Sequence, residues 1–244
     1  MRRRFFVNRF DANSIALTGD AAEHLGRVLR AEPGQQYELS DGQRVFLARI
    51  ERITLRKRGE SSIEFTLVEP IDAREPALKV ELLMSLIKFD RFEWCLEKAT
   101  ELGVTEIVPL AAARTDKPLI AAAGKRIERW QKIVLESAQQ SRRLRPPEIR
   151  SAVRAVDAFA LSKAARKILL SERRDAKPMA EFLRNMPQPT ASLAIGPEGG
   201  WTDDELAAAR TAGFVEASLG ENILRTETAV IASLALLQFA SLPR

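Results

Sequence analysis

Two charged residues near the end of the chain, Arg225 and Glu227, stand among apolar neighbours and could do chemistry together. A cation in such a place can stabilise a developing negative charge, and a carboxylate can orient that cation or accept a proton. A buried charge needs an oppositely charged partner even when it has no catalytic role, because an unpaired buried charge destabilises the fold. An internal salt bridge at the start of the apolar helix expected over Val230–Ala240 explains the same pair, and the sequence leaves both interpretations open.

Two glycine-containing loops lie just before this pair. Gly196-Pro197-Glu198-Gly199-Gly200 follows the apolar run Ala191–Ile195, and Gly220-Glu221-Asn222 follows the apolar run Phe214–Leu219. If both runs are parallel strands, the loops meet at the carboxyl edge of a sheet, where ligands usually bind. Any one of the glycines could instead be a turn residue or a helix cap. The first loop matches neither the dinucleotide fingerprint nor a phosphate loop.

The elements that would position these loops alternate between strand and helix, which indicates a parallel α/β sheet. We expect buried strands at Val80–Ile87, Val104–Leu110 and Lys167–Leu170, and helices at Asp90–Leu102, Ile127–Ala138 and Met179–Leu183. Thr202 and Glu205 have capping-box spacing, which predicts that a helix begins directly after the first glycine loop.

The first part of the chain has a different pattern of short strands between turns. Strands are expected at Tyr37–Leu39, Val45–Ile50 and Ser62–Val68, with a hairpin turn at Asp41-Gly42 and a helix over Ala21–Leu29. This pattern predicts a small β-barrel. Pro70–Pro76 has two prolines and no periodicity, which is typical of a linker. We therefore place one domain at residues 1–71 and a second at residues 72–244.

Composition excludes several classes of protein. The chain has 244 residues, a formal net charge of +5 and a pI of about 9.6, so an anionic partner is plausible. Cys95 is the single cysteine and His24 the single histidine, which are too few ligands for a Cys/His zinc site. A histidine-based catalytic triad would have to use His24, and no nucleophile motif lies near it. We expect no metal. Neither a signal peptide nor a membrane span is indicated, so the expected location is the cytoplasm.

The segment from Lys125 to Arg154 is the most basic part of the chain. It carries nine Lys or Arg residues against three Asp or Glu residues. Within it, Gln140-Ser141-Arg142-Arg143-Leu144-Arg145-Pro146-Pro147 cannot continue as a helix because of its prolines. Guanidinium groups on such a loop suit phosphate binding or stacking on bases. A merely solvated basic loop is the alternative.

Five motifs together resemble one family. They are IGPEGGWTDDEL, LGENILRTETA, KATELGV, QQSRRLRPPEI and HLGRVLR, which lie from position 24 to position 229. They are similar to motifs of the RsmE family of 16S ribosomal RNA uridine-N3 methyltransferases, of the SPOUT class, and the resemblance covers essentially the whole chain. It implies a PUA-like barrel, a knotted α/β methyltransferase domain, the cofactor S-adenosylmethionine, and a homodimer that acts on 16S rRNA within the 30S subunit.

The resemblance also assigns residues. It implies cofactor binding by Leu170, Ser171, Ile195, Gly196, Pro197, Glu198, Gly199, Gly200, Leu219, Gly220, Asn222, Ile223, Leu224 and Thr228. Arg225 and Glu227 become the candidate catalytic residues. RNA contacts are expected from Arg2, Arg3, Arg4, Arg27, Arg30, Lys88, Arg114, Gln140, Arg142, Arg143 and Arg145. Arg142 stands where the family usually has glycine, so either Arg142 or Arg143 takes the place of the family's arginine.

Both the cofactor and the reaction agree with the residue types. S-adenosylmethionine has no phosphates, and its adenine needs apolar walls, which Leu219, Ile223 and Leu224 can supply. Methylation at N3 requires removal of an imide proton without a catalytic histidine. Arg225 is then the candidate for charge stabilisation, and either Glu227 or water accepts the proton.

Two other classes remain as alternatives. A noncatalytic RNA-binding protein of ribosome assembly could keep the same fold. A nucleotide-dependent oxidoreductase is disfavoured, because no GxGxxG follows any expected strand.

Overall fold

The computed structural model describes residues 3–10, 14–57, 59–73, 75–183 and 189–241. Its contacts divide the chain into two compact units. The first comprises Met1–Glu75 together with Ala138–Arg145, and the second comprises Pro76–Ser137 together with Pro146–Arg244. The sequence did not indicate that residues 138–145 belong with the first unit.

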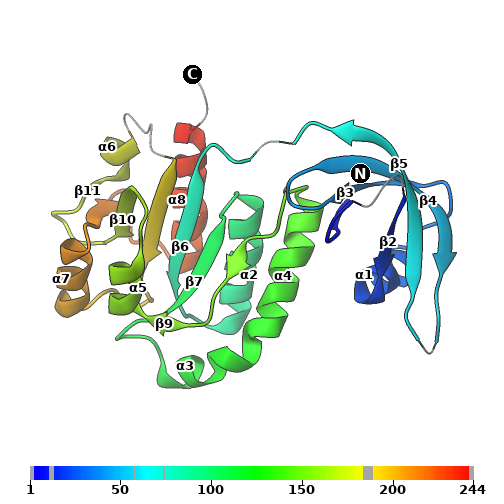
Figure 1. Ribbon diagram of the computed structural model, residues 1–244. Coiled ribbons are helices and arrows are strands. Elements are labelled where there is room, and N and C mark those ends of the chain that lie inside the picture. Colours follow the sequence, from blue (N-terminus) through cyan, green and yellow to red (C-terminus); the bar gives the residue numbers. More distant parts are fainter. Residues whose placement is uncertain (1–2, 11–13, 58, 74, 184–188, 242–244) are drawn as a thin grey trace. The chain divides into compact units, whose positions relative to one another are not determined.

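The first unit is built on a five-stranded sheet in the order β1-β3-β4-β5-β2 (Figure 1). Its strands are β1 (Arg4–Phe6), β2 (Ser14–Thr18), β3 (Gln36–Ser40), β4 (Val45–Thr54) and β5 (Ser62–Ile71). All neighbours are antiparallel except β1 and β3. Leu39, Ile50, Ile63 and Phe65 are buried at alternating positions and form the core of this curled sheet. The small β domain predicted from the sequence is therefore confirmed.

The helix predicted over Ala21–Leu29 has two parts. A short α-helix, α1 (Gly19–Glu23), continues as a π-helical turn, η1 (His24–Val28). Gly26 lies in that turn against the β4–β5 hairpin. A Cβ atom at Gly26 would lie 2.8 Å from Cδ2 of Leu55, so a larger residue here would require that exposed leucine side chain to shift.

The second unit is organised around one parallel sheet in the order β11-β13-β10-β12-β6-β7-β8, with β9 also paired to β7. Its strands are β6 (Lys79–Ser85), β7 (Glu106–Ala111), β8 (Glu148–Ile149), β9 (Val153–Arg154), β10 (Arg166–Leu170), β11 (Lys177–Pro178), β12 (Thr190–Ile195) and β13 (Val215–Ser218). Every pairing in this sheet is parallel, which confirms the predicted α/β architecture.

Helices cover both faces of this sheet (Figure 1). They are α2 (Phe89–Glu101), α3 (Lys117–Ala123) with the 3-10 turn η2 (Gly124–Arg126), α4 (Ile127–Gln140), α5 (Ala155–Leu161), α6 (Met179–Leu183), α7 (Asp203–Thr211) and α8 (Thr226–Ser241). Helices α3 and α5 and the short strands β1, β2, β8, β9 and β11 were not predicted.

Successive side chains of a strand point to opposite faces of the sheet, so the sheet has a separate hydrophobic core on each face. Leu82 and Met84 of β6 face a core shared with α2, α4 and α8, whereas Leu83 faces a core shared with α5 and α7. Helix α8 is strongly apolar and packs against α2. No helix in the described residues combines the length and the apolar character that crossing a membrane requires.

Candidate functional site

A cavity of about 600 Å³ lies in the second unit, where the loops after β10, β12 and β13 come together. Because these strands are parallel neighbours, their carboxyl ends meet at one edge, as the sequence led us to expect. The predicted cofactor residues that line the cavity are Leu170, Ser171, Ile195, Gly196, Pro197, Glu198, Gly200, Leu219, Gly220, Asn222, Ile223 and Leu224. Gly199 and Thr228 lie in the same segments but do not line it.

Trp201, which the sequence analysis did not select, packs beneath the first glycine loop and holds it in place. Its indole Nε1 donates a hydrogen bond to the backbone oxygen of Leu170 at 3.0 Å, which links the loop to the end of β10. A Cβ atom at Gly196 would lie only 3.0 Å from Cε2 of Trp201. Glycine at position 196 therefore permits the backbone to rest on the indole. An aromatic residue directly after a glycine loop is the signal that could have identified it.

The predicted capping box is present at the start of α7. Thr202 Oγ1 accepts a hydrogen bond from the Glu205 backbone N–H at 3.3 Å, and Glu205 Oε2 accepts one from the Thr202 N–H at 3.0 Å. The other oxygen of buried Glu205 accepts from the Ala113 N–H at 2.8 Å. Glu205 thus joins the loop after β7 to the start of α7, which follows the first glycine loop.

Arg114, expected to contact RNA, lines the cavity instead of standing apart from it. Its Nη1 donates a hydrogen bond to the backbone oxygen of Gly199 at 2.7 Å. A Cβ atom at Gly199 would lie 3.3 Å from Cβ of Arg114. The arginine therefore supports the first glycine loop and also carries positive charge at the cavity.

The two candidate catalytic residues are separated by the structure. Arg225 is exposed and lines the cavity, whereas Glu227 is partly buried in the first turn of α8 and does not line it. The expectation that Arg225 is buried is therefore wrong. Among the described residues, no ion pair joins Arg225 to Glu227. Residues two apart at a helix start do not face each other, which explains why they are not paired.

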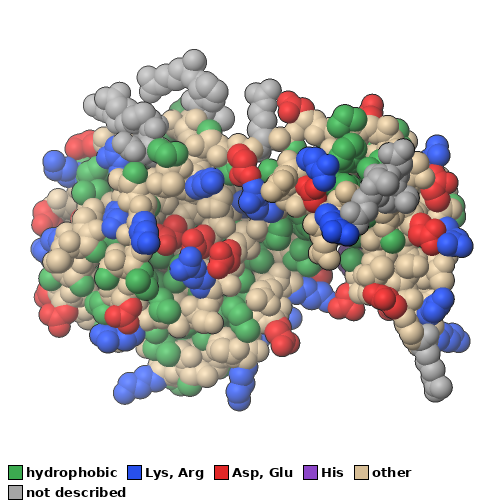
Figure 2. Space-filling model, viewed as in Figure 1, with side chains coloured by type: hydrophobic (Ala, Val, Ile, Leu, Met, Phe, Trp, Pro, Cys, Tyr) green, Lys and Arg blue, Asp and Glu red, His purple; other side chains and the backbone are tan. Residues whose placement is uncertain are grey.

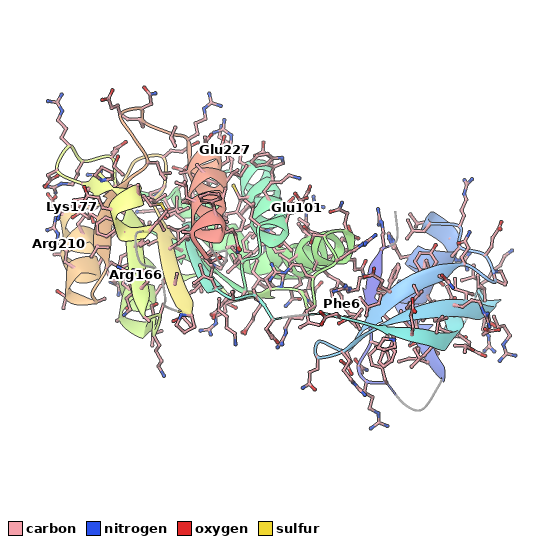
Figure 3. All side chains as sticks on the ribbon, turned by 90° about the horizontal axis from the view of Figure 1, so that it is seen from above. Phe6, Glu101, Arg166, Lys177, Arg210 and Glu227 are labelled. Atoms are coloured by element: carbon pink, nitrogen blue, oxygen red, sulfur yellow. The ribbon has the colours of Figure 1, made fainter. Side chains whose placement is uncertain are left out.

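Glu227 is directed at α2 (Figure 3), the helix against which α8 packs. Its Oε1 lies 4.0 Å from Nε of Arg91, and its Oε2 is buried without a hydrogen-bond partner in the part of the chain that is described. Burial, together with the negative charge of Glu227, raises the pKa of the Cys95 thiol to about 12. Cys95 is therefore a protonated core side chain.

The basic loop after α4 packs within the first unit. Ser40 Oγ donates a hydrogen bond to the Leu144 backbone oxygen at 2.6 Å, and Arg145 forms an ion pair with Glu75. Arg142 has φ +54°, in the left-handed region, which explains why glycine would suit this position. Its Nη1 lies 3.6 Å from Oε1 of Glu38.

Arg4 and Arg143 differ from the exposed arginines that the sequence suggested. Arg4 is buried, and its Nη2 lies 2.8 Å from Oε2 of Glu38, which argues against the phosphate contact expected of it. Burial lowers the pKa of Arg143 to about 10. Both guanidinium groups therefore contribute to the packing of the first unit.

The remaining expected RNA contacts are mostly on the surface. Arg27, Arg30, Lys88 and Gln140 are exposed and Arg3 is partly buried, whereas Arg2 lies outside the described residues. Basic and acidic side chains are interspersed over the face shown in Figure 2. On the face shown, charge alone therefore does not mark an RNA-binding surface.

Comparison with known proteins agrees with this geometry. A family model described as an RNA methyltransferase domain matches residues 74–238, and one described as an RNA methyltransferase PUA domain matches residues 17–57. A protein of Mesomycoplasma hyopneumoniae named ribosomal RNA small subunit methyltransferase E is 33% identical over 229 residues, which are 93% of this chain and 95% of that protein. The chain belongs to the ribosomal RNA small subunit methyltransferase E family.

Two solved structures of similar proteins cover nearly the entire chain. A methyltransferase from Legionella pneumophila in complex with the cofactor SAM has a TM-score of 0.84 and 31% identity, over 98% of both chains. A ribosomal RNA small subunit methyltransferase E from Neisseria gonorrhoeae, bound to S-adenosyl methionine, has a TM-score of 0.84 and 30% identity, again over 98% of both chains. The α/β methyltransferase fold predicted from the sequence is thereby confirmed.

Proposed function

We propose that the chain is an S-adenosylmethionine-dependent methyltransferase that methylates N3 of a uridine in 16S ribosomal RNA, within the small ribosomal subunit. The observation that carries the proposal is the cavity of about 600 Å³ formed by the two glycine loops. Family membership and the two cofactor-bound relatives support the same assignment. They do not favour a noncatalytic assembly factor.

The residues around the cavity fit this cofactor. The volume lies in the range of about 300–1,000 Å³ that is usual for small-molecule sites. Leu219, Leu224 and Trp201 supply apolar and aromatic surface for an adenine ring, and the backbones of the glycine loops leave room for close approach. Glu172 also lines the cavity, and its negative charge favours a sulfonium cofactor. When bound, the cofactor supplies an electrophilic methyl group.

Arg225 is the residue that we assign to the uridine base. Its guanidinium is exposed at the cavity, so it can reach a base that is presented from outside. Loss of the N3 proton leaves negative charge on the base, which a neighbouring guanidinium stabilises. Glu227 does not line the cavity, which supports water as the acceptor of that proton. Beyond this charge stabilisation, the rate of methyl transfer is raised by holding N3 of the uridine in line with the methyl group of the cofactor.

Further parts of the proposal concern partners, location and topology. The exposed arginines of the first unit and of the loop after α4 bind rRNA phosphates in the cytoplasm. Two chains associate, which would cover the apolar surface of α8, where Phe239 is 78% exposed and Leu236 40% exposed. The chain end is threaded through an earlier loop as a trefoil knot. Sedimentation as a monomer at micromolar concentration would exclude the dimer, and an unthreaded chain in a crystal structure would exclude the knot.

Methyl transfer from labelled cofactor tests the central proposal. Purified 30S subunits and free 16S RNA are each incubated with the protein, and the RNA is then digested to nucleosides and separated. We expect label in 3-methyluridine. Label in a ribose methyl group or in guanosine would refute the assignment. Cofactor binding without transfer to either substrate would favour the noncatalytic assembly factor.

A further inference from the structure

Arg91 lies between two carboxylates that belong to different parts of the site. It is the third residue of α2, the helix that follows β6. Its Nη1 donates a hydrogen bond to Oε1 of Glu198 at 2.6 Å, and its Nε lies 4.0 Å from Oε1 of Glu227. Glu198 belongs to the first glycine loop, and Glu227 belongs to the first turn of α8.

Glu227 depends on this arginine more than Glu198 does. The side chain of Glu227 is 18% exposed and that of Glu198 is 53% exposed. Within the described residues, Arg91 is the one Lys or Arg within 4.0 Å of Glu227, and the second oxygen of this carboxylate is buried without a hydrogen-bond donor. A partly buried carboxylate is costly without a positive neighbour, so Arg91 and Glu227 stabilise each other's placement.

Among the described residues, one other hydrogen bond joins the two segments, and it is weak. The hydroxyl of Thr226 reaches the backbone oxygen of Gly196, but the distance is 3.4 Å, long for a hydrogen bond. The charged chain Glu198–Arg91–Glu227 is therefore the stronger connection between the first glycine loop and the start of α8.

We propose that Arg91 is a positioning residue that holds the two sides of the cofactor cavity together, through Glu198 on one side and Glu227 on the other. Arg91 does not line the cavity, so it acts on the loops and not on the ligand. This inference rests on the proposed function, because it takes S-adenosylmethionine as the ligand of the cavity.

Replacement of Arg91 by Gln removes the charge and retains a polar side chain. An exposed ion pair changes an equilibrium constant by about two- to five-fold, and loss of the less exposed Glu227 contact adds a similar factor. We therefore expect the Kd for S-adenosylmethionine and for S-adenosylhomocysteine, measured by titration calorimetry, to rise about five- to twenty-fold. The KM for cofactor should rise by the same factor, while kcat at saturating cofactor stays within about two-fold.

Arg129→Gln is the matched control. Arg129 is an arginine of α4 that also pairs with α2, through a hydrogen bond of 2.8 Å to Oε2 of Glu93, but it touches neither loop. We expect its Kd for cofactor to equal that of the unaltered protein. Equal cofactor affinity in Arg91→Gln and Arg129→Gln would overturn the inference, as would a loss of kcat with unchanged KM.

A double-mutant cycle distinguishes a specific interaction between Arg91 and Glu198 from a nonspecific loss of structure in either variant. Glu198→Gln alone should weaken cofactor binding, and Arg91→Gln with Glu198→Gln should weaken it by less than the product of the two single effects. Arg91→Lys, which keeps the charge, should recover part of the affinity. Fully multiplicative effects would overturn the inference. If the unaltered protein binds no S-adenosylmethionine, the proposed function fails instead, and the two failures are thereby distinguished.

Discussion

Gly196→Ala tests whether the first glycine loop needs a glycine for its close approach to Trp201. The added Cβ would lie 3.0 Å from Cε2, 3.2 Å from Nε1 and 3.3 Å from Cδ2 of the indole. These distances require a shift of a few tenths of an ångström. The indole cannot easily move, because it donates a hydrogen bond to Leu170 and its ring centroid lies 5.6 Å from that of Phe159.

The expected cost follows from this confinement. Adding a methyl group to a well-packed site costs about 1–3 kcal/mol. We expect Gly196→Ala to reduce the free energy of unfolding by that amount in chemical denaturation. Calorimetry should show weaker binding of S-adenosylmethionine, because Gly196 and Trp201 both line the cavity.

Gly124→Ala is the control, since a Cβ atom at Gly124 meets nothing within 4 Å and its φ is −58°. It should be neutral or stabilising by up to about 1 kcal/mol. Trp201→Phe introduced with Gly196→Ala should make the two effects less than additive. Equal stability and equal cofactor affinity in Gly196→Ala and Gly124→Ala would refute the packing argument.

Three further predictions concern charged residues. Arg225→Ala should greatly reduce turnover in the methyl-transfer assay while largely sparing cofactor affinity; an equal loss of both would make Arg225 structural. Replacing the two exposed loop arginines Arg142 and Arg145 together should flatten the dependence of RNA affinity on salt by up to ~1.4 units, at about 0.7 per phosphate contact, and an unchanged slope would exclude that loop from the RNA site. Glu38→Ala should reduce the free energy of unfolding by about 3–5 kcal/mol, because it leaves buried Arg4 unpaired. Arg4→Ala should cost less in the same denaturation experiment, because Arg142 remains 3.6 Å from Glu38; equal costs would contradict this account.

The parts of the site that the sequence predicted are those encoded locally. The glycine loops, the capping box of Thr202 and the strands before each loop depend on residues close together in the chain. Parallel pairing then brings the loops together by a general rule of α/β sheets. For these reasons most of the residues expected to bind the cofactor line one cavity.

The parts that the sequence did not predict depend on contacts between distant residues. Arg91 and Glu198 are 107 positions apart, and Ser40 and Leu144 are 104 positions apart. The spacing of apolar residues along the sequence cannot predict such a contact. The possible ion pair between Arg225 and Glu227 was wrong for a different reason, because closeness in sequence suggested a contact that the geometry of a helix start does not allow.

The return of residues 138–145 to the first unit has a consequence for how the chain can be cut. The polypeptide passes from one compact unit to the other near positions 75, 137 and 145. A protease that cleaves near Glu75 therefore separates residues 1–75 from segment 138–145 of the same compact unit, because that segment stays in the other fragment. A gene truncated to begin at Pro76 would encode that segment without the strands that bury Leu144. Separating the two units intact requires a circular rearrangement or a replacement of the loop, and a single cut does not suffice.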